Sequence, residues 1–473
     1  MKVNISSAVT SVAHQVLGVL KNIFTLDIRS LAVLRIGIAV VVLFDVLARA
    51  LYLEAHYTDL GVIPRDILLQ SNQYFWRVSL YFFSGNPYVV GALFVATVVV
   101  AIFFLFGYKT RISTVVLWIL ILSMQNRNFM LNNGGDAVLR LLLFWGMFLP
   151  LGAAFSIDSR RRINGNQVFS MGTIAFILQV ISIFIFSALL KDTIEWRSDF
   201  TAIQKALSLS QYASAEASIL LKFPEVLKLM TWTVWHIELI APFMLIFPYY
   251  SKYLRIIIPC ILIAMLFSFG IFLKIGFFPF ITSIALLAFF PPEFWRLITK
   301  KRLVTKAYRE GGLLHRVQAI VASCLIVSVL LWNLNTLRNV KLPFLIYTIP
   351  LMYTLDLDQS WIMFSRFHTK NKWWVVVSGV TSDGRKLDLL RNGKVAVYTK
   401  PESIASEYKS KEWQKYFNYL VLPHYFRYRR PYLDYSCRNW NYYHKGRDSI
   451  DIVRLEYMTE LQNPIILGQI VCR

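Results

Sequence analysis

The sequence is poor in charge and in cysteine. Only 16% of its 473 residues are charged, whereas 56% are hydrophobic and the mean hydropathy is +0.51. Soluble globular proteins carry about 25% charged residues, so a soluble domain and a disordered chain are both excluded. Four cysteines in 473 residues are too few for a disulfide-dense secreted module. The composition therefore predicts a membrane protein.

The sequence also lacks the common motifs of soluble enzymes. It has no Gly-rich phosphate loop, no His-Glu-x-x-His, no Cys-x-x-Cys and no Gly-x-Ser-x-Gly. ATP-driven, zinc-dependent and hydrolase functions lose most of their support. The remaining candidates for function are polar side chains in or beside apolar helices, where they are costly and by default point to function.

Long apolar runs occupy the chain before about residue 340. Crossing a hydrocarbon core of about 30 Å takes about 20 mostly apolar residues. Nine runs qualify: 31–52, 88–108, 112–125, 136–156, 167–190, 229–250, 253–274, 276–291 and 317–337. Because 112–125 and 276–291 are short, either one could instead be re-entrant. The sequence thus predicts an all-α polytopic membrane bundle of about eight to nine transmembrane helices.

The basic residues predict the orientation of this bundle. With a cytoplasmic N-terminus, 17 Lys and Arg residues lie in cytoplasmic segments, seven of them in 296–316, and 10 lie in the opposite segments up to residue 340. This follows the positive-inside rule, and an odd number of spans then places 341–473 outside the cytoplasm. We read the net charge of +23 as a topology signal, with the lipid bilayer as partner and no nucleic acid.

Three domains follow. Residues 1–30 form an amphipathic helix, for which lying on the bilayer surface and packing on the body are equally compatible with the periodicity. Residues 31–340 form the transmembrane domain. Residues 341–473 form a small extracytoplasmic α+β domain, with a three-stranded meander over 373–399, helices in 402–420 and 428–440, and a last strand over 450–457. Cys437 and Cys472 could pair there or remain buried thiols.

Several polar groups in or at the edge of the apolar runs are site candidates. Asp45 and Arg49 are four residues apart on one helical face, where they can neutralise each other structurally. His236 and Glu238 point in different directions, so a shared site needs another helix. Lys191 ends an apolar run, where a poorly solvated lysine can act as a base, or snorkel to the headgroups. Two further candidates lie in the polar loop 126–136, which forms a cup or a helix cap: Asn132 and Asn133.

Several segments, considered together, resemble the HTTM family, the bacterial relatives of vitamin K-dependent gamma-glutamyl carboxylase. The resemblance covers roughly residues 20–300, and the tail around 355–364 looks like the C-terminal extension of bacterial members. The order and spacing of the segments carry it: 26–37, 57–65, Arg111-Ile112-Ser113, Asn132-Asn133-Gly134-Gly135-Asp136 and Lys191-Asp192-Thr193-Ile194-Glu195-Trp196.

The resemblance implies that Lys191, five residues before Trp196, matches the lysine base that deprotonates a quinol. Glu238 falls where the carboxylase has an acidic residue. One departure is Gly134, where the carboxylase has a catalytic histidine, and the runs 253–274 and 276–291 contain no histidine. These departures make a carboxylase of the animal type doubtful, and they leave a quinol-linked or peptide-modifying reaction open.

The implied function is a carboxylase-like lyase in the bacterial cytoplasmic (inner) membrane. It would use a reduced quinone such as vitamin K hydroquinone to modify an exported peptide. The alternative is a non-catalytic membrane factor for the maturation or export of a secreted peptide. A transporter ranks third, because few polar residues fall in the spans and no inverted repeat is visible.

Overall fold

We describe a computed structural model of the chain, covering residues 5–71, 75–160, 165–299, 312–367, 373–401, 404, 407–460 and 463–472. Its helices are α1 (Ile5–Phe24), α2 (Ile28–Ala50), α3 (Leu53–Tyr57), α4 (Arg65–Leu69), α5 (Pro87–Phe106), α6 (Thr110–Arg127), α7 (Gly134–Gly146), α8 (Met171–Leu190), α9 (Ile194–Arg197), α10 (Ala202–Leu207), α11 (Ala217–Leu220), α12 (Pro224–Leu245), α13 (Ser251–Phe272), α14 (Phe278–Leu287), α15 (Pro292–Thr299), α16 (Leu313–Asn335), α17 (Ile349–Thr354), α18 (Lys411–Leu420) and α19 (Arg429–Tyr443). Its strands are β1 (Leu26–Asp27), β2 (Gln167–Val168), β3 (Trp373–Thr381), β4 (Lys386–Asp388), β5 (Lys394–Val395), β6 (Ile450–Thr459) and β7 (Ile465–Val471).

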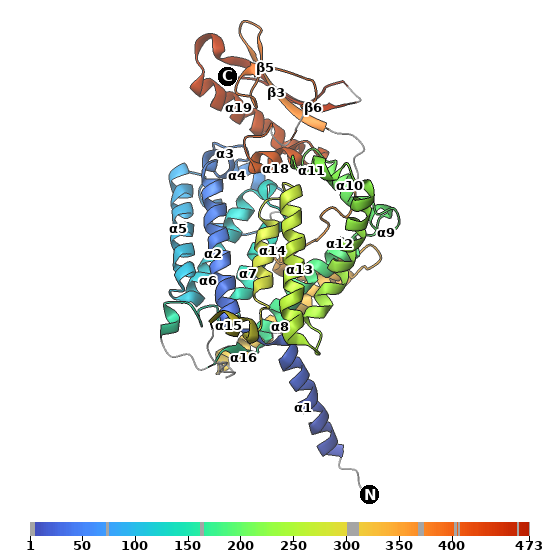
Figure 1. Cartoon of the computed structure of the whole chain (residues 1–473). Helices are drawn as coiled ribbons and strands as arrows, with labels where there is room; N and C mark the ends of the chain where they lie inside the picture. The colour runs from blue at the N-terminus through green and yellow to red at the C-terminus, as the bar shows by residue number, and fades with distance from the viewer. Residues whose placement is uncertain are drawn as a thin grey trace.

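The body is a helical bundle with α8 near its centre (Figure 1). In its most apolar stretch, 78% of the residues of α8 are buried, against 28% for α5, α13 and α16, which therefore lie at the periphery. α8 packs against α12 and α16, and α2 packs against α5 and α14. Large apolar side chains such as Phe44, Phe106 and Ile112 remain exposed on the outside of the body. An apolar outer surface around a packed core suits contact with lipid, so the chain is an integral membrane protein.

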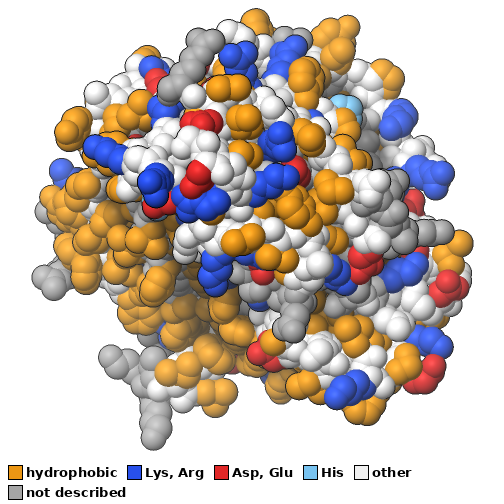
Figure 2. Space-filling view, turned by 90° about the horizontal axis from the view of Figure 1, so that it is seen from above, with side chains coloured by type: hydrophobic (Ala, Val, Ile, Leu, Met, Phe, Trp, Pro, Cys, Tyr) orange, Lys and Arg blue, Asp and Glu red, His pale blue; other side chains and the backbone are white. Residues whose placement is uncertain are grey.

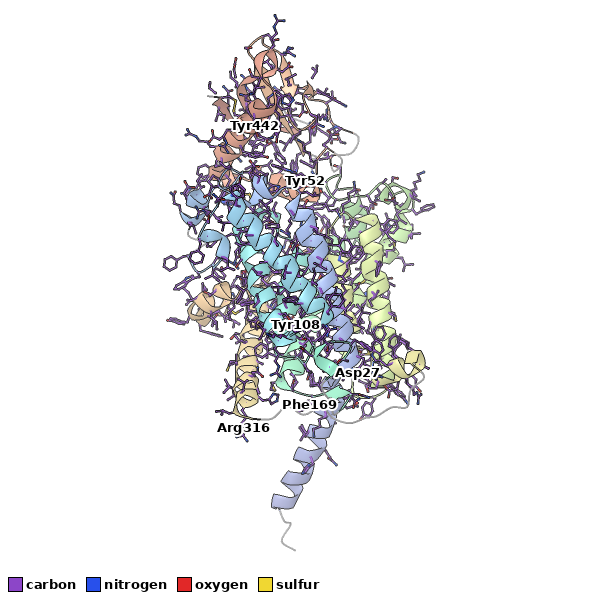
Figure 3. All side chains as sticks on the ribbon, turned by 90° about the vertical axis from the view of Figure 1, so that its left-hand side faces the viewer. Asp27, Tyr52, Tyr108, Phe169, Arg316 and Tyr442 are labelled. Atoms are coloured by element: carbon purple, nitrogen blue, oxygen red, sulfur yellow. A yellow bond between two sulfur atoms is a disulfide. The ribbon has the colours of Figure 1, made fainter. Side chains whose placement is uncertain are left out.

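Local sequence explains where the long helices begin and end. Asp27 accepts a hydrogen bond from the Arg29 amide at the start of α2, and Asn86 caps α5 in the same way. α5 ends at Gly107, whose φ of 66° is the left-handed conformation that glycine adopts without strain. Figure 3 shows Asp27 and Tyr52 towards opposite ends of the bundle, with Tyr52 just below the C-terminal domain.

The predicted count of eight to nine spans is not confirmed. Among the described residues, five helices are long and apolar enough to cross a membrane, namely α2, α5, α8, α13 and α16. A sixth span is possible if α14 and α15, bent by 94°, count as one. At 1.5 Å per residue, α7 with 13 residues and α14 with 10 reach only about 20 and 15 Å. α6 and α12 are long enough but less apolar, and α12 carries Glu225, Lys228 and Glu238.

The α1 helix does not pack along the body. It extends away from the bundle, at the end opposite the C-terminal domain (Figure 1), and Val16, Leu17 and Val19 are exposed on it. Its C-terminal end is held by hydrogen bonds to the segment that begins α13: Asn22 Nδ2 donates to the Pro248 carbonyl over 3.0 Å, Ser251 Oγ donates to Asn22 over 3.2 Å, and Arg255 donates to the Ile23 carbonyl. Packing of this helix along the body is therefore wrong, and its position on the bilayer surface stays a prediction.

Two of the basic segments that predict the orientation are only partly described. Residues 300–311 of the segment 296–316 lie outside the described residues, as do residues 161–164.

The C-terminal domain contains an antiparallel five-stranded sheet in the order β5-β4-β3-β6-β7. The predicted meander is β3 to β5, and β6 pairs with β3 along almost its whole length. The sequence did not predict β7, and the helix expected in 402–420 begins only at Lys411. Figure 3 shows Tyr442 of α19 within this domain, above Tyr52. The structure joins Cys437 of α19 to Cys472, just after β7, in a disulfide.

Residues 355–367, which we call the strap, connect the body to the C-terminal domain. The sequence assigns them to the outer domain, but Leu357 and Trp361 are buried in the core of the body. Gln359 exchanges hydrogen bonds with Gln179 of α8, 2.8 and 3.2 Å long. Arg77 forms ion pairs with the carboxylates of the strap, Asp356 and Asp358. The strap is therefore fixed to the bundle, and the sheet begins only at Trp373.

Candidate functional site

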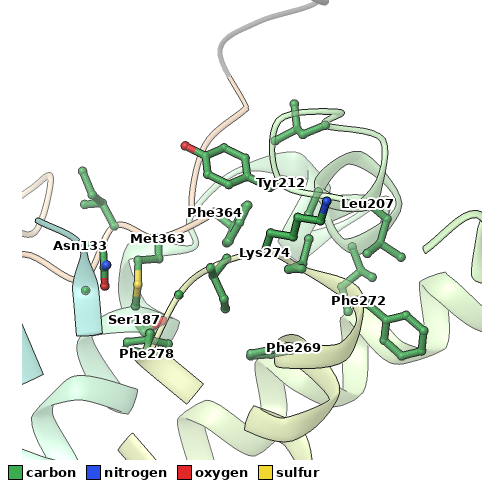
Figure 4. A pocket seen from close by; sticks show the side chains of 18 of the residues that line it. Asn133, Ser187, Leu207, Tyr212, Phe269, Phe272, Lys274, Phe278, Met363 and Phe364 are labelled. Atoms are coloured by element: carbon green, nitrogen blue, oxygen red, sulfur yellow. The ribbon is translucent and has the colours of Figure 1, made fainter. Parts of the chain in front are cut away.

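A cavity of about 590 Å³ lies at the end of the bundle that carries the C-terminal domain. Its walls come from α8, α12, α13, α14, the loop after α13, the strap and α18. Figure 4 shows part of the wall, with Phe269, Phe272 and Phe278 near Met363, Phe364 and Tyr212. Mostly apolar walls with a few polar groups are typical of a small-molecule site.

Lys191 and Glu238 form a buried ion pair in the wall of this cavity. Lys191 ends α8, whose C-terminal carbonyls favour a cation, and Glu238 lies within α12. The ammonium also lies over the ring of Trp196, 4.5 Å from its centre, and Ser187 Oγ donates to the Glu238 carboxylate over 3.2 Å. Because Lys191 is only 4% exposed, the snorkelling alternative is wrong.

His236 takes no part in this cluster. Its ring lies tilted against that of Trp232 and edge-on to that of Trp235, with centre-to-centre distances of 4.1 and 4.6 Å, and its Nδ1 lies 2.7 Å from the Trp232 carbonyl oxygen. His236 does not line the cavity, whereas Glu238 does. The side chains of His236 and Glu238 point in different directions, as their spacing of two residues implied. Glu238 finds its partner on another helix, α8, which ends at Lys191.

Asn132, Asn133 and Gly134 line the cavity from the start of α7. Asn133 and Asp136 form a capping box, so the expected helix cap is present. A Cβ placed on Gly134 would lie 2.6 Å from the sulfur of Met363 in the strap. A side chain at the position where the carboxylase pattern has a histidine would therefore require the Met363 side chain to shift.

Asp45 and Arg49 belong to a second buried cluster beside the cavity. Arg49 Nε donates to Asp45 over 2.8 Å, and its other nitrogens bond Tyr57 Oη and the Asp136 carboxylate. The intrahelical ion pair expected from the sequence is part of this larger network. Its last member is Lys415 of α18, whose Nζ lies 3.9 Å from Asp136 Oδ2.

Lys415 connects this cluster to the cavity. It lines the cavity and donates to the Leu131 carbonyl over 3.0 Å. Burial lowers the pKa of Lys415, and the nearby Asp136 carboxylate partly opposes that shift. Three other basic residues outside the long helices also line the cavity: Lys274, Arg366 and Lys411.

The sequence did not indicate several residues of the site, among them Lys415, Met363 and Lys274. Lys415 is one of several lysines on an exposed-looking amphipathic helix, and Met363 lies in a segment without periodicity. The one signal in the sequence for Lys415 is its spacing of four residues from Lys411, which places the two lysines on the same face of α18. No group of three or more His, Cys, Asp or Glu able to hold a metal ion occurs among the described residues.

Comparison with known proteins gives no match for this chain, whether to a family model, to a curated protein or to a solved structure.

Proposed function

We propose that this protein is a membrane-embedded enzyme in which Lys191 exchanges a proton with a lipid-soluble substrate. The observation that carries the proposal is the Lys191–Glu238 pair in the wall of a mostly apolar cavity. Buried charges are rare unless they are paired, and a pair that lines a cavity is a candidate for acid–base chemistry. The resemblance to the HTTM family, which assigns a lysine base to this position, supports the same role.

The Lys191–Glu238 pair can supply a base by itself, because Glu238 can accept the proton that Lys191 must lose. If the ammonium proton of Lys191 passes to the Glu238 carboxylate, Lys191 becomes a neutral amine with a free lone pair. That amine can then take a proton from an acidic hydroxyl of a bound substrate. Ser187, one turn before Lys191 on α8, donates to the same oxygen of the Glu238 carboxylate and helps to hold it beside Lys191. Positioned proton transfer of this kind accelerates reactions by about 10²- to 10⁴-fold.

The cavity fits a reduced quinone. Its volume of about 590 Å³ falls within the range of small-molecule sites, and Phe184, Phe269 and Phe278 offer apolar and aromatic contacts. A reduced quinone there would supply an acidic hydroxyl and two reducing electrons. In this proposal the orientation is the one that the basic residues predict, with the cavity on the outer side of a bacterial cytoplasmic membrane and an exported peptide as the molecule modified.

The test uses the purified full chain in lipid with a reduced quinone, O2 and labelled bicarbonate. Quinone epoxide and incorporated label are measured. We expect turnover, with Lys191→Ala lowering it at least about 100-fold and Glu238→Gln lowering it as well. Lys228→Ala is the control, because Lys228 is an exposed lysine of α12, the helix that carries Glu238, and does not line the cavity; it should retain most turnover. Equal turnover in Lys191→Ala and the parent chain would refute the role of Lys191.

A non-catalytic membrane factor is the second candidate, and one observation favours it. Lys191 is already satisfied by Glu238 and by the ring of Trp196, as expected for a contact that only joins α8 to α12. Replacing both partners with apolar residues of similar size is often neutral for stability. The double variant Lys191→Met with Glu238→Leu should therefore fold. If it retains a cellular phenotype that deletion of 341–473 abolishes, the second candidate is correct.

A further inference from the structure

The charges around the cavity are unevenly distributed. Five basic side chains line it, Lys191, Lys274, Arg366, Lys411 and Lys415, and the single acidic one is Glu238. Glu238 is bound to Lys191, so the other four cations face the cavity without an acidic neighbour in its lining. Figure 2, which views this end of the molecule from above, shows Lys and Arg side chains spread among apolar ones.

The acidic neighbours of these four cations lie outside the lining. Asp192 approaches Arg366 at 3.7 Å and Asp136 approaches Lys415 at 3.9 Å, both longer than a direct hydrogen bond. Lys274 experiences the charge of Glu216, and Lys415 that of Glu412.

Lys411 makes no ion pair with any residue in the described part of the chain. The rim formed by Lys274, Arg366, Lys411 and Lys415 therefore retains capacity for an anion.

The apolar and cationic parts of the lining come from different elements. Phe184 comes from α8, Phe269 and Phe272 come from α13, and Phe278 comes from α14. The cationic rim comes from the loop after α13, the strap and α18, all beyond the ends of the long helices. In Figure 4 the amine of Lys274 lies beside Tyr212 and Leu207, above the phenylalanines. The cavity thus combines an apolar floor with a cationic rim.

We propose that this cavity binds an amphiphile with an apolar chain and a phosphate or other anionic head, with the head on the rim. This inference rests on the proposed function in taking the same cavity as the working site, and it adds a second class of ligand. Cations paired with a bound phosphate form charge-assisted hydrogen bonds, while the chain buries apolar surface against the floor. An acidic peptide would satisfy the rim but would leave the phenylalanine floor without a complementary partner.

The experiment measures equilibrium binding of labelled dodecyl phosphate to the full chain in a maltoside detergent. Dodecyl phosphocholine has the same chain with a zwitterionic head, and inorganic phosphate has the anion without a chain. We expect dodecyl phosphate to bind at least tenfold tighter than either compound. Lys274→Glu combined with Lys411→Glu should weaken it on the order of tenfold or more, because two attractions become repulsions. Both lysines are exposed, so the variant should fold.

The matched control is Lys386→Glu combined with Lys445→Glu, which makes the same charge change at exposed positions away from the cavity. It should alter the dissociation constant less than about twofold. Equal binding of the two dodecyl compounds would overturn the role of the rim. Equal affinity for inorganic phosphate would overturn the role of the floor. Stronger displacement by a hexaglutamate peptide than by dodecyl phosphate would show a peptide site instead.

This outcome can be separated from that of the proposed function. The double variant Lys191→Met with Glu238→Leu should abolish turnover while leaving dodecyl phosphate binding within about threefold, because it removes one positive and one negative charge from the lining together and leaves the rim intact. Turnover without selective binding of the anionic amphiphile would overturn the inference and leave the proposed function. Selective binding of the anionic amphiphile without turnover would overturn the proposed function and leave the inference.

Discussion

The interface between the bundle and the C-terminal domain should weaken in acid because of His56. This side chain lies on α3, beyond the end of α2, and is 1% exposed. Its ring lies 4.4 Å from that of Trp413 and 5.9 Å from that of Tyr416, both on α18. Neither ring nitrogen has a hydrogen-bond partner among the described residues. Burial, with a smaller contribution from the nearby Arg49, lowers the pKa of His56 to about 3.

The sign and size of the effect follow from this lowered pKa. Below about pH 6.5 the unfolded chain binds a proton at His56 that the folded chain does not, so stability falls as the pH falls towards 3. The loss amounts to about 1.4 kcal/mol per pH unit, which gives about 2 kcal/mol at pH 5. His56→Phe keeps an aromatic ring against Trp413 and removes the titrating group.

The assay compares free energies of unfolding from denaturant titrations at pH 8 and pH 5. Relative to the parent chain, His56→Phe should gain about 2 kcal/mol of stability on going from pH 8 to pH 5. His424→Gln, at an exposed histidine of the C-terminal domain, is the control and should show no such gain. If His56→Phe and the parent chain lose the same stability in acid, the reasoning is wrong.

Two further predictions concern stability. Arg49→Met leaves the carboxylates of Asp45 and Asp136 buried without their main partner, so the free energy of unfolding should fall by about 3–5 kcal/mol, measured by denaturant titration; a loss below 1 kcal/mol would contradict it. Cys437→Ser removes a crosslink over a sequence separation of 35, which should destabilise the C-terminal domain by about 4 kcal/mol in thermal unfolding. Adding a reductant to the parent chain should reproduce the second loss, and no effect of reductant would count against it.

Much of the fold was predictable from sequence because its signals are local. Five of the nine apolar runs are the long helices, and the Asp-Gly and Asn-Gly turns marked the strands β3 to β5. The four other runs are not confirmed as spans: α7 and α14 are short helices, and α6 and α12 are long enough but less apolar. β7 was missed because the sequence between it and its partner β6, residues 460–464, carries no strong hairpin signal.

The candidate site was predictable only in part. Lys191, Asn133 and Glu238 all line the cavity, but the sequence did not indicate that Glu238 is the partner of Lys191. The two are 47 residues apart, and only the packing of α12 on α8 brings them together. His236, the other candidate on the same helix, does not line the cavity, and its ring packs against that of Trp232.

The sequence by itself determined that this is a helical membrane protein with a separate basic C-terminal domain, because composition and periodicity follow from each residue's own chemistry. Only the tertiary structure decided what surrounds Lys191, which strap residue lies against Gly134, and how Lys415 of the C-terminal domain reaches the cavity. Each of these depends on a contact between segments far apart in the chain. Such contacts are selected by the packing of the whole molecule and leave no periodic trace in the sequence.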